Sequence, residues 1–252
     1  MSEKQRYFIE LSYNGTNYHG WQSQPNANTV QEELNNALAT ILREPVETVG
    51  CGRTDTGVHA KEFFVHFDSE SLGIGHQSLG KVTSGLNAIL PHDIALKRII
   101  QVHTDAHARF DATLRSYEYH IHFEKDPFKL NRSWELRDKP DIALMNQAAK
   151  IIMDYTDFSC FSKSNTQTFT NNCKISRAEW VDNGDGLVFY ISADRFLRNM
   201  VRAIVGTLIL VGRKEMEPEG IRDIIESKNR SNAGTSVPAC GLYLTEVKYT
   251  YL

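Results

Sequence analysis

The order in which strand-like and helix-like apolar patterns follow one another constrains the fold of this chain more than any other feature. In the first half, alternating apolar residues predict strands and apolar residues at helical spacing predict helices. The strands are expected at residues 6–13, 46–51, 61–68 and 94–102, and the helices at 29–42 and, more weakly, 76–88. The resulting order β-α-β-β-α-β is typical of a ferredoxin-like unit.

The helix at 29–42 carries the clearest pattern of the first half. Thr29 and Glu32 have the spacing of a capping box, in which a threonine hydroxyl accepts from the first turn of a helix. One apolar face then follows, made of Val30, Leu34, Ala37, Leu38, Ile41 and Leu42.

The second half repeats a similar order of strands and helices less clearly, without sequence identity to the first half. The expected elements are strands at 115–123, 174–182, 186–193 and 241–249, and helices at 140–153, 196–211 and 218–227. Residues 183–186 (NGDG) are a hairpin signal between two of these strands. We therefore predict an α+β chain in which two tightly packed halves, 1–108 and 109–252, share a continuous, mostly antiparallel sheet. Helices would cover one face, and a cleft would form where the halves meet.

Composition places the chain among ordinary globular proteins. It has 252 residues, of which 41% are hydrophobic and 23% are charged. No apolar run approaches the roughly 20 residues needed to span a bilayer. The polar N-terminus leads directly into a predicted strand, so we expect no signal peptide and a cytoplasmic location.

Cysteines and histidines do not form a recognisable metal site. The four cysteines are scattered and include no C-x-x-C pair, which argues against structural zinc and disulfides. The pair His120 and His122 would share one face of a strand, and His103 and His107 could share a helix face, but neither has a third ligand at a familiar spacing. The net charge of −3 does not indicate nucleic-acid binding, so any RNA contact must come from local basic patches.

The most informative segment is residues 52–60 (GRTDTGVHA), a short connection between two predicted strands. Its glycines permit close approach of a substrate and place Asp55 at the apex of the loop. Arg53 could hold a phosphate, pair with the carboxylate, or fill space left by a displaced base. On spacing alone, a solvated turn in which Asp55 bonds its own backbone is the plainer alternative.

Residues 55–57 (DTG) also spell the tripeptide of aspartic proteases, in which two such loops meet and share a proton. Only one copy is present, so a symmetric dimer would be needed. The predicted helices and the preceding Gly-Arg both argue against this alternative, since those proteases are nearly all β and use a hydrophobic strand there.

The whole segment 52–60 resembles the GRTDAGVHA signature of TruA-type tRNA pseudouridine synthases, with Thr56 in place of alanine. Further segments are similar to motifs of that family along nearly the whole chain: 13–22 (YNGTNYHGWQ), 29–31 (TVQ), 109–112 (RFDA), 115–117 (RSY), 157–161 (DFSCF), 196–206 (FLRNMVRAIVG) and 241–244 (GLYL). The resemblance implies the pseudouridine synthase fold and an enzyme that isomerises uridine to pseudouridine without metal or cofactor. It further implies a homodimer that acts at positions 38, 39 and 40 of the tRNA anticodon stem-loop.

By this resemblance Asp55 is the nucleophile, which attacks either C1′ of the ribose or the uracil ring. An ionised carboxylate in a water-poor pocket needs an opposing cation, because burial alone raises its pKa. The resemblance assigns that role to Arg202, on the helix expected at 196–211, where Arg195, Arg198 and Arg202 would form one basic flank. Without the family, this flank would be an ordinary solvated charge stripe.

Tyr117 is assigned by resemblance as the tyrosine that stacks on the target uracil, although its pattern alone suits a half-buried residue of a sheet. Leu242 is either a wall of the uracil pocket or a plain core residue. The cations that could form a basic cleft for tRNA are Arg53, Arg109, Arg115, Lys163, Arg195, Arg198 and Arg202.

The chain departs from the family in three places. Besides Thr56, Arg198 and Asn199 stand where many members carry histidine, and the loop 163–172 has no counterpart that can be aligned. A catalytically silent tRNA-binding or RNA-folding protein on the same scaffold remains the alternative function. Such a protein would be free to lose Asp55, Arg202 and Tyr117, and this chain has all three.

Overall fold

The computed structural model describes residues 4–72, 78–162 and 170–252, so most of the 163–172 loop, including Lys163, and the start of the helix expected at 76–88 lie outside the described residues. The chain separates into two compact units. The first unit comprises Met1–Thr113 and Leu244–Leu252, and the second comprises Leu114–Tyr243. None of the helices formed by the described residues is long and apolar enough to cross a membrane.

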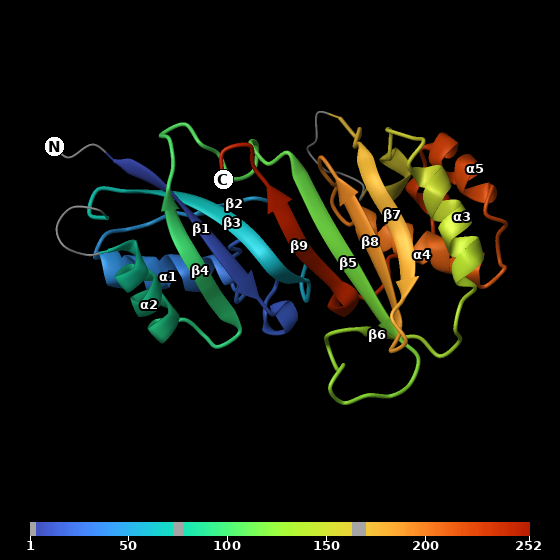
Figure 1. The fold of residues 1–252 in the computed structure, drawn as a ribbon, viewed down its shortest axis with the longest axis horizontal. Coiled ribbons are helices and arrows are strands. Elements are labelled where there is room, and N and C mark those ends of the chain that lie inside the picture. Colours follow the sequence, from blue (N-terminus) through green and yellow to red (C-terminus); the bar gives the residue numbers. More distant parts are fainter. Residues whose placement is uncertain (1–3, 73–77, 163–169) are drawn as a thin grey trace. The chain divides into compact units, whose positions relative to one another are not determined.

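The first unit has the predicted element order (Figure 1). Its elements are β1 (Gln5–Tyr13), α1 (Val30–Leu42), β2 (Val49–Gly50), β3 (His59–Ser69), α2 (Leu79–Ile89) and β4 (Ile94–Gln101). Strand β1 lies antiparallel between β3 and β4, and the short β2 pairs antiparallel with β3. The order β-α-β-β-α-β predicted from the apolar patterns is confirmed.

Helix α1 begins and ends where its sequence predicts. The hydroxyl of Thr29 accepts a hydrogen bond from the N–H of Glu32 at 3.4 Å, and the left-handed Arg43 ends the helix. Val30, Leu34 and Leu38 of its apolar face are fully buried, and Ile41 is half-buried. Helix α1 contacts α2, and α2 packs along β4, so the helices cover the core of the first unit.

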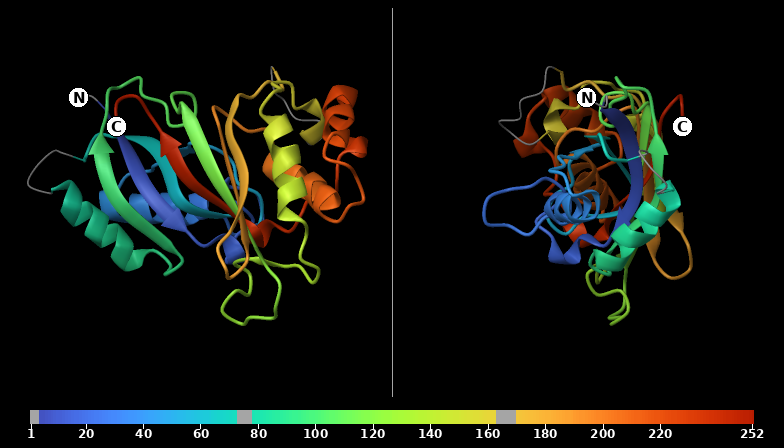
Figure 2. Two further views of the ribbon diagram at one scale, coloured as in Figure 1. Left: turned by 45° about the vertical axis from the view of Figure 1, so that its right-hand side comes forward. Right: turned by 90° about the vertical axis from the view of Figure 1, so that its left-hand side faces the viewer.

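The described residues of the second unit form a hairpin-based sheet and three α-helices. Its elements are β5 (Leu114–His122), β6 (Trp134–Glu135), α3 (Ile142–Ile152), β7 (Ile175–Asp182), β8 (Leu187–Ala193), α4 (Met200–Gly212), α5 (Gly220–Ser227) and the start of β9 (Leu242–Lys248). Strand β8 pairs antiparallel with both β5 and β7. Helix α3 contacts β7, α4 and α5, and Figure 2 shows these three helices gathered together beside the β7–β8 hairpin.

The strand order of the nine-stranded sheet is β4-β1-β3-β9-β5-β8-β7, with β2 on β3 and β6 on β5. The mixed α+β class with a large, mostly antiparallel sheet is therefore confirmed. The expected cleft between the two halves, and their division at residue 108, stay predictions. Strand β6, which runs parallel to β5, was not predicted because two residues are too few to show an alternating pattern.

The predicted start of the helix at residue 196 is wrong. Helix α4 begins at Met200, because Asn199 has a φ of +65° and this left-handed conformation cannot continue an α-helix backwards. Arg195 and Arg198 consequently precede the helix and do not form one flank with Arg202. Helix α4 is buried on nearly every side, so its apolar residues form no single face whose beginning would mark the first turn of the helix.

Candidate active site

The loop that carries Asp55 connects β2 to β3 in the first unit. Cys51 donates its N–H to the carbonyl of Phe64 at 2.7 Å, which continues the ladder of β2 and β3 up to the loop. A tight turn leads back into β3, where Val58 donates its N–H to the carbonyl of Asp55 at 3.1 Å and Gly57 has a φ of +78°. Within this loop Asp55 is half-buried, so its carboxylate lies at the boundary between core and solvent.

The backbone of residues 13–22 lies directly against this loop. Trp21 donates its N–H to the carbonyl of Thr54, and Gly57 donates its N–H to the carbonyl of Tyr18, both at 3.3 Å. A Cβ placed on Gly20 would lie only 2.2 Å from the carbonyl oxygen of Thr54. Two loops in backbone contact on both sides of Asp55 leave it little freedom to move.

Side chains complete the contact between the two loops. The Tyr13 hydroxyl, on a side chain only 4% exposed, shares a hydrogen bond of 2.9 Å with the hydroxyl of Thr54. His59 is buried, and its Nδ1 accepts the N–H of Gly15 at 3.1 Å, so a neutral ring carries its proton on Nε2. These bonds hold Thr54, which precedes Asp55, and His59, with which β3 begins.

An aromatic cluster supports the same loop from the core. The ring of Trp21 lies 4.4 Å from that of Phe63 and is stacked on Tyr13 at 6.5 Å. A Cβ on Gly50 would meet the Trp21 indole at 2.6 Å, so only glycine fits there. The apolar core of the first unit therefore extends directly under the Asp55 loop.

Tyr117 and Arg115 lie on β5 of the second unit. Tyr117 is half-buried opposite Ile191, and its ring stands perpendicular to that of Phe196 with 5.1 Å between the ring centres. Arg115 is 9% exposed, and its guanidinium donates to the carbonyl of Asp194 at 3.0 Å. Arg115 thus contributes to the packing of β5, whereas Tyr117 is only half-buried.

Arg202 lies in the first turn of α4, where it is bound to the segment 234–238. Its Nε donates to the carbonyl of Val237 at 2.7 Å, and the N–H of Val237 donates to the carbonyl of Arg202 at 3.3 Å. The same segment approaches α4 so closely that a Cβ on Gly206 would lie 1.8 Å from the carbonyl oxygen of Thr235. These contacts restrict the orientation of the Arg202 guanidinium.

Tyr119 binds the segment 234–238 from the β5 side. Its buried hydroxyl donates to the carbonyl of Pro238 at 2.8 Å, and burial raises the pKa of this phenol. Leu242, at the start of β9, is 6% exposed. That burial suits a core residue and a pocket wall equally, so both alternatives for Leu242 stay open.

Asp157, the first residue of the DFSCF segment, organises a turn of the second unit. It accepts the N–H of Ser159 at 3.0 Å and the Ser159 hydroxyl at 2.6 Å, and forms an ion pair with Lys228 at 2.8 Å. The hydrogen bonds from Lys228 and Ser159 lower the pKa of Asp157 to about 2. Asp157 is therefore a structural carboxylate.

The remaining predicted RNA contacts differ in exposure. Arg53 and Arg198 are exposed, and Arg195 is half-buried. Arg109 is exposed and lies 5.7 Å from the ring centre of Phe110. Asp55, Arg53 and Arg109 belong to the first unit, and the other predicted site residues belong to the second. Pairing of Asp55 with Arg202 stays a prediction.

Several residues that position the site were not predicted individually. Tyr13, Gly20 and His59 lie in segments already noted for their resemblance to the family, but nothing in their spacing shows that they bind the Asp55 loop. Contacts between distant segments leave no periodic pattern in one sequence. The glycines of residues 13–22 were the only local signal of a close backbone approach.

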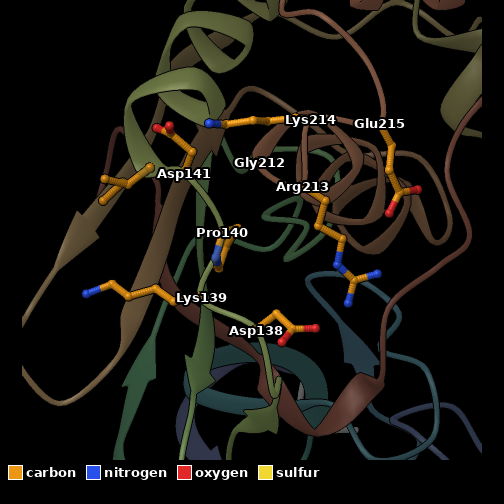
Figure 3. Close-up of a pocket in the computed structure, with 9 residues that line it drawn as sticks. Asp138, Lys139, Pro140, Asp141, Gly212, Arg213, Lys214 and Glu215 are labelled. Carbon is orange, nitrogen blue, oxygen red and sulfur yellow. The ribbon is translucent and has the colours of Figure 1, made fainter.

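No group of three or more potential metal ligands occurs among the residues that the structure describes. His103 and His107 lie in turns, so the helix face suggested for them does not form. A shallow groove of about 900 Å³ lies in the second unit, lined by residues 138–142 and 212–215 (Figure 3). It mixes acidic and basic side chains and contains none of the predicted site residues.

Comparison with protein families identifies the class of this site. A family model described as tRNA pseudouridine synthase matches residues 11–111 and 151–250. The chain belongs to the tRNA pseudouridine synthase family. The matched ranges contain the Asp55 loop, the residues that bind it, Arg202 and Leu242, whereas Tyr117 lies between them.

Relatives of the family resemble the chain over nearly its full length. A tRNA pseudouridine synthase A from Parabacteroides distasonis is 52% identical, covering 97% of this chain and 96% of the relative. Those from Bacteroides thetaiotaomicron and Clostridium acetobutylicum are 50% and 38% identical, covering 97% and 96% of this chain and 91% and 98% of the relatives. As a family member, the protein is an isomerase that acts on tRNA and converts uridine to pseudouridine.

Proposed function

We propose that this enzyme uses Asp55 as the nucleophile to isomerise uridines at positions 38, 39 and 40 of the tRNA anticodon stem-loop. The observation that carries the proposal is the position of Asp55 on a loop bound by the backbone of Tyr18, Trp21 and the closely packed Gly20. A fixed, half-buried carboxylate suits a nucleophile, because the fold already holds it in place and no free energy is spent on orienting it in each turnover.

The reaction breaks the bond between the uracil nitrogen N1 and C1′ and forms a bond between C5 and C1′. The proton on C5 must then move to a base and N1 must gain a proton, so no atom is lost overall and no oxidant is needed. The Asp55 carboxylate can attack C1′ or the uracil ring, and either attack requires that it be ionised. A flipped-out uridine would bring both atoms within reach of a carboxylate at the surface of the fold.

Arg202 would provide the cation that keeps Asp55 ionised. Its Nε bond to Val237 orients the guanidinium, and a planar fork suits a carboxylate better than a lysine does. Tyr117 would stack on the uracil, since its half-buried ring keeps an accessible part. Arg53 would fill the place of the extruded nucleotide or hold its phosphate, and Leu242 would line the uracil pocket.

Several neighbouring target positions require recognition of tRNA shape and phosphates more than of base sequence. The exposed cations Arg53, Arg109 and Arg198 and the half-buried Arg195 would contribute to that recognition. Arg115 is the weaker candidate, because its guanidinium is buried against Asp194. A homodimer would place a second copy of these cations beside the same tRNA.

The test is chemical mapping of pseudouridine on unmodified tRNA transcripts incubated with the purified protein. We expect modification at positions 38–40 by the wild type and none by Asp55→Ala or Asp55→Asn. Thr56→Ala is the matched control, since Thr56 is the exposed neighbour of Asp55 and alanine stands there in the family signature. This control should stay fully active.

The other outcomes separate the alternatives. If the wild type binds tRNA yet forms no pseudouridine on any transcript, the silent binding protein is the correct description. If Asp55→Ala remains active, another residue is the nucleophile. Modification only outside positions 38–40 would leave the reaction intact and refute the proposed target positions.

A further inference from the structure

A turn in the first unit, far along the chain from the Asp55 loop, presents a large aromatic side chain to solvent. Phe110 is 74% exposed, although Ala106 and Ala108 beside it are fully buried. A phenylalanine side chain carries roughly 150–250 Å² of mostly apolar surface, and folding normally removes most of it from water. The fold therefore keeps Phe110 outside while burying its neighbours.

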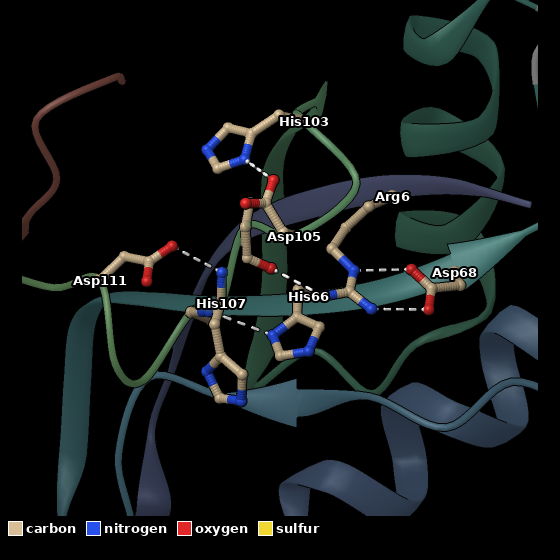
Figure 4. Close-up of polar contacts among 9 residues, drawn as sticks. Arg6, His66, Asp68, His103, Asp105, His107 and Asp111 are labelled. Atoms are coloured by element: carbon tan, nitrogen blue, oxygen red, sulfur yellow. Dashed lines mark hydrogen bonds and ion pairs between the residues drawn. The ribbon is translucent and has the colours of Figure 1, made fainter.

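The turn that carries Phe110 is held rigidly. His107 donates its N–H to the Asp111 carboxylate at 2.7 Å (Figure 4). The Nδ1 of the same histidine accepts the N–H of Arg109 at 3.1 Å. Asp111 also accepts the hydroxyl of Tyr251 at 2.8 Å. None of these bonds uses the side chain of Phe110.

Three further bonds fix the buried alanines before and inside the turn. The N–H of Ala108 donates to Nδ1 of His66 at 3.1 Å, and its carbonyl accepts the hydroxyl of Tyr249 at 2.6 Å. Arg6 donates to the carbonyl of Ala106 at 3.0 Å while forming a bidentate pair with Asp68 (Figure 4). The exposed ring thus stands on a backbone that needs no ordering when a partner binds.

The side chains beside the Phe110 ring are of the kinds that bind nucleotides in RNA complexes. The guanidinium of Arg109 lies 5.7 Å from the centre of the Phe110 ring, and the ring of His107 lies 4.3 Å from it at a tilt of 36°. Aromatic rings and arginine planes are the groups on which unpaired RNA bases stack. The nearby carboxylate of Asp111 already accepts two protein donors, which reduces its repulsion of a phosphate.

We infer that Phe110 and Arg109 form a platform on which an unpaired base of the bound tRNA stacks, at a place separate from the target uridine. The inference rests on the tRNA substrate of the family and not on the role of Asp55. His59, beside the Asp55 loop, and His66, which binds the Phe110 turn, are both on β3. Seven residues of strand separate them, which corresponds to about 23 Å.

An RNA base fits this surface better than a second copy of the chain does. A stable protein interface buries about 800 Å² on each partner around an apolar centre. Phe110 is instead one strongly exposed ring beside the polar His107 and Arg109, and the ring of Tyr251, whose hydroxyl binds Asp111 of the same turn, is only 36% exposed. One aromatic face beside one cation matches one base and its phosphate.

The experiment measures tRNA binding by Phe110→Ala, Phe110→Leu and Phe110→Trp, with a fluorescently labelled unmodified tRNA transcript as the probe. We expect the Kd to rise about 5- to 100-fold for alanine and for leucine, because both lack a π-face. Tryptophan should bind as tightly as the wild type or tighter. Ile89→Ala, which removes another half-exposed apolar side chain of the first unit, should leave the Kd unchanged.

A direct readout of stacking comes from the fluorescence of Phe110→Trp. Two of the three native tryptophans, Trp21 and Trp180, are at most 3% exposed, so they are shielded from direct contact with tRNA. The wild type then measures how far the native tryptophans respond to tRNA. Addition of tRNA should quench the variant more strongly than the wild type. Melting temperatures should agree among the variants, since no hydrogen bond of the turn uses the ring of Phe110.

Three outcomes would overturn the inference. Phe110→Ala could bind tRNA as tightly as the wild type, or leucine could restore the affinity and so show a merely apolar contact. Sedimentation could instead show that Phe110→Ala changes the oligomeric state at unchanged tRNA affinity, which would make a second copy the partner. An inactive wild type that still binds tRNA through Phe110 would refute the proposed function and leave this inference intact.

Discussion

The α-carbon of Gly20 faces the carbonyl oxygen of Thr54 so closely that a Cβ on Gly20 would lie 2.2 Å from that oxygen. Gly20 also has a φ of +91°, a backbone conformation that residues other than glycine rarely adopt. The loop at residues 13–22 is therefore in backbone contact with the residue that precedes Asp55. Because of this contact, the position of the proposed nucleophile depends on a segment that lies far from it in the sequence.

Gly20→Ala should strongly reduce pseudouridine formation. The added methyl group must push Thr54 and hence Asp55 away, and a displacement of about 1 Å in an active site can lower kcat about 100-fold. Single-turnover rates on saturating tRNA measure the effect. Gly80→Ala in α2 is the control, because nothing lies within 4 Å of its Cβ and alanine favours a helix, so activity should persist and stability rise slightly. Equal activity of both variants would refute this role of Gly20.

Tyr13→Phe and Thr54→Val should each lower kcat about 5- to 10-fold by removing their shared hydrogen bond of 2.9 Å, whose net contribution is about 1 kcal/mol. The double variant should be no worse than the more damaged single variant, because both changes remove the same bond. Tyr7→Phe removes a similar buried hydroxyl that donates to Leu72, and should lower the melting temperature without changing kcat. Fully additive losses would contradict a shared positioning role.

Arg202→Lys should lower kcat at least 100-fold while changing the melting temperature little. Lysine keeps the positive charge but cannot donate to Val237 and face a carboxylate with a planar fork at the same time. Arg213→Lys, at the exposed end of the same helix, is the matched control and should be fully active. If lysine supports normal turnover at position 202, charge alone is sufficient and the oriented fork is not needed.

Asp157 should stabilise the fold in a pH-dependent way. Its pKa of about 2 lies below the usual value near 3.9, so its contribution is full above about pH 5 and is lost as the pH falls towards 2. Since the side chain is 34% exposed, solvent screening reduces that contribution to about 1 kcal/mol. Urea unfolding of Asp157→Asn should show this deficit at pH 7 and none near pH 2. A deficit of the same size at both values would exclude an ionic origin.

His66 should make the free energy of unfolding increase with pH between about 4 and 6.5. Burial lowers the pKa of His66 to about 4, whereas in the unfolded chain it is near 6.5. The unfolded state therefore binds more protons in this window, and the stabilisation is lost as the pH falls through it. His66→Asn offers an acceptor for the Ala108 N–H without titrating, and should flatten the profile measured by urea unfolding. An NMR titration of His66 with a midpoint near 6.5 would contradict the prediction.

Most of the fold was predictable because its elements carry strong local signals. The capped helix α1, the β7–β8 hairpin with its NGDG turn and the β-α-β-β-α-β order of the first unit each follow from side-chain periodicity and turn residues. The start of α4 was not, because Asn199 in a left-handed conformation delays the helix to Met200, and the apolar residues of the buried α4 do not mark that position. The two-residue strand β6 is too short to carry any pattern.

The sequence by itself determined the family and the residues proposed for the chemistry, since a nine-residue motif around Asp55 identifies a family in a way that no periodicity does. Only the tertiary structure decided how those residues are held. It placed Gly20 and Tyr13 against Thr54, bound Arg202 to Val237, buried Arg115 and left Phe110 in solvent. The physical reason is that hydrogen bonds and steric contacts between distant segments depend on the packing of the whole unit, whereas motifs and periodicities are properties of neighbouring residues.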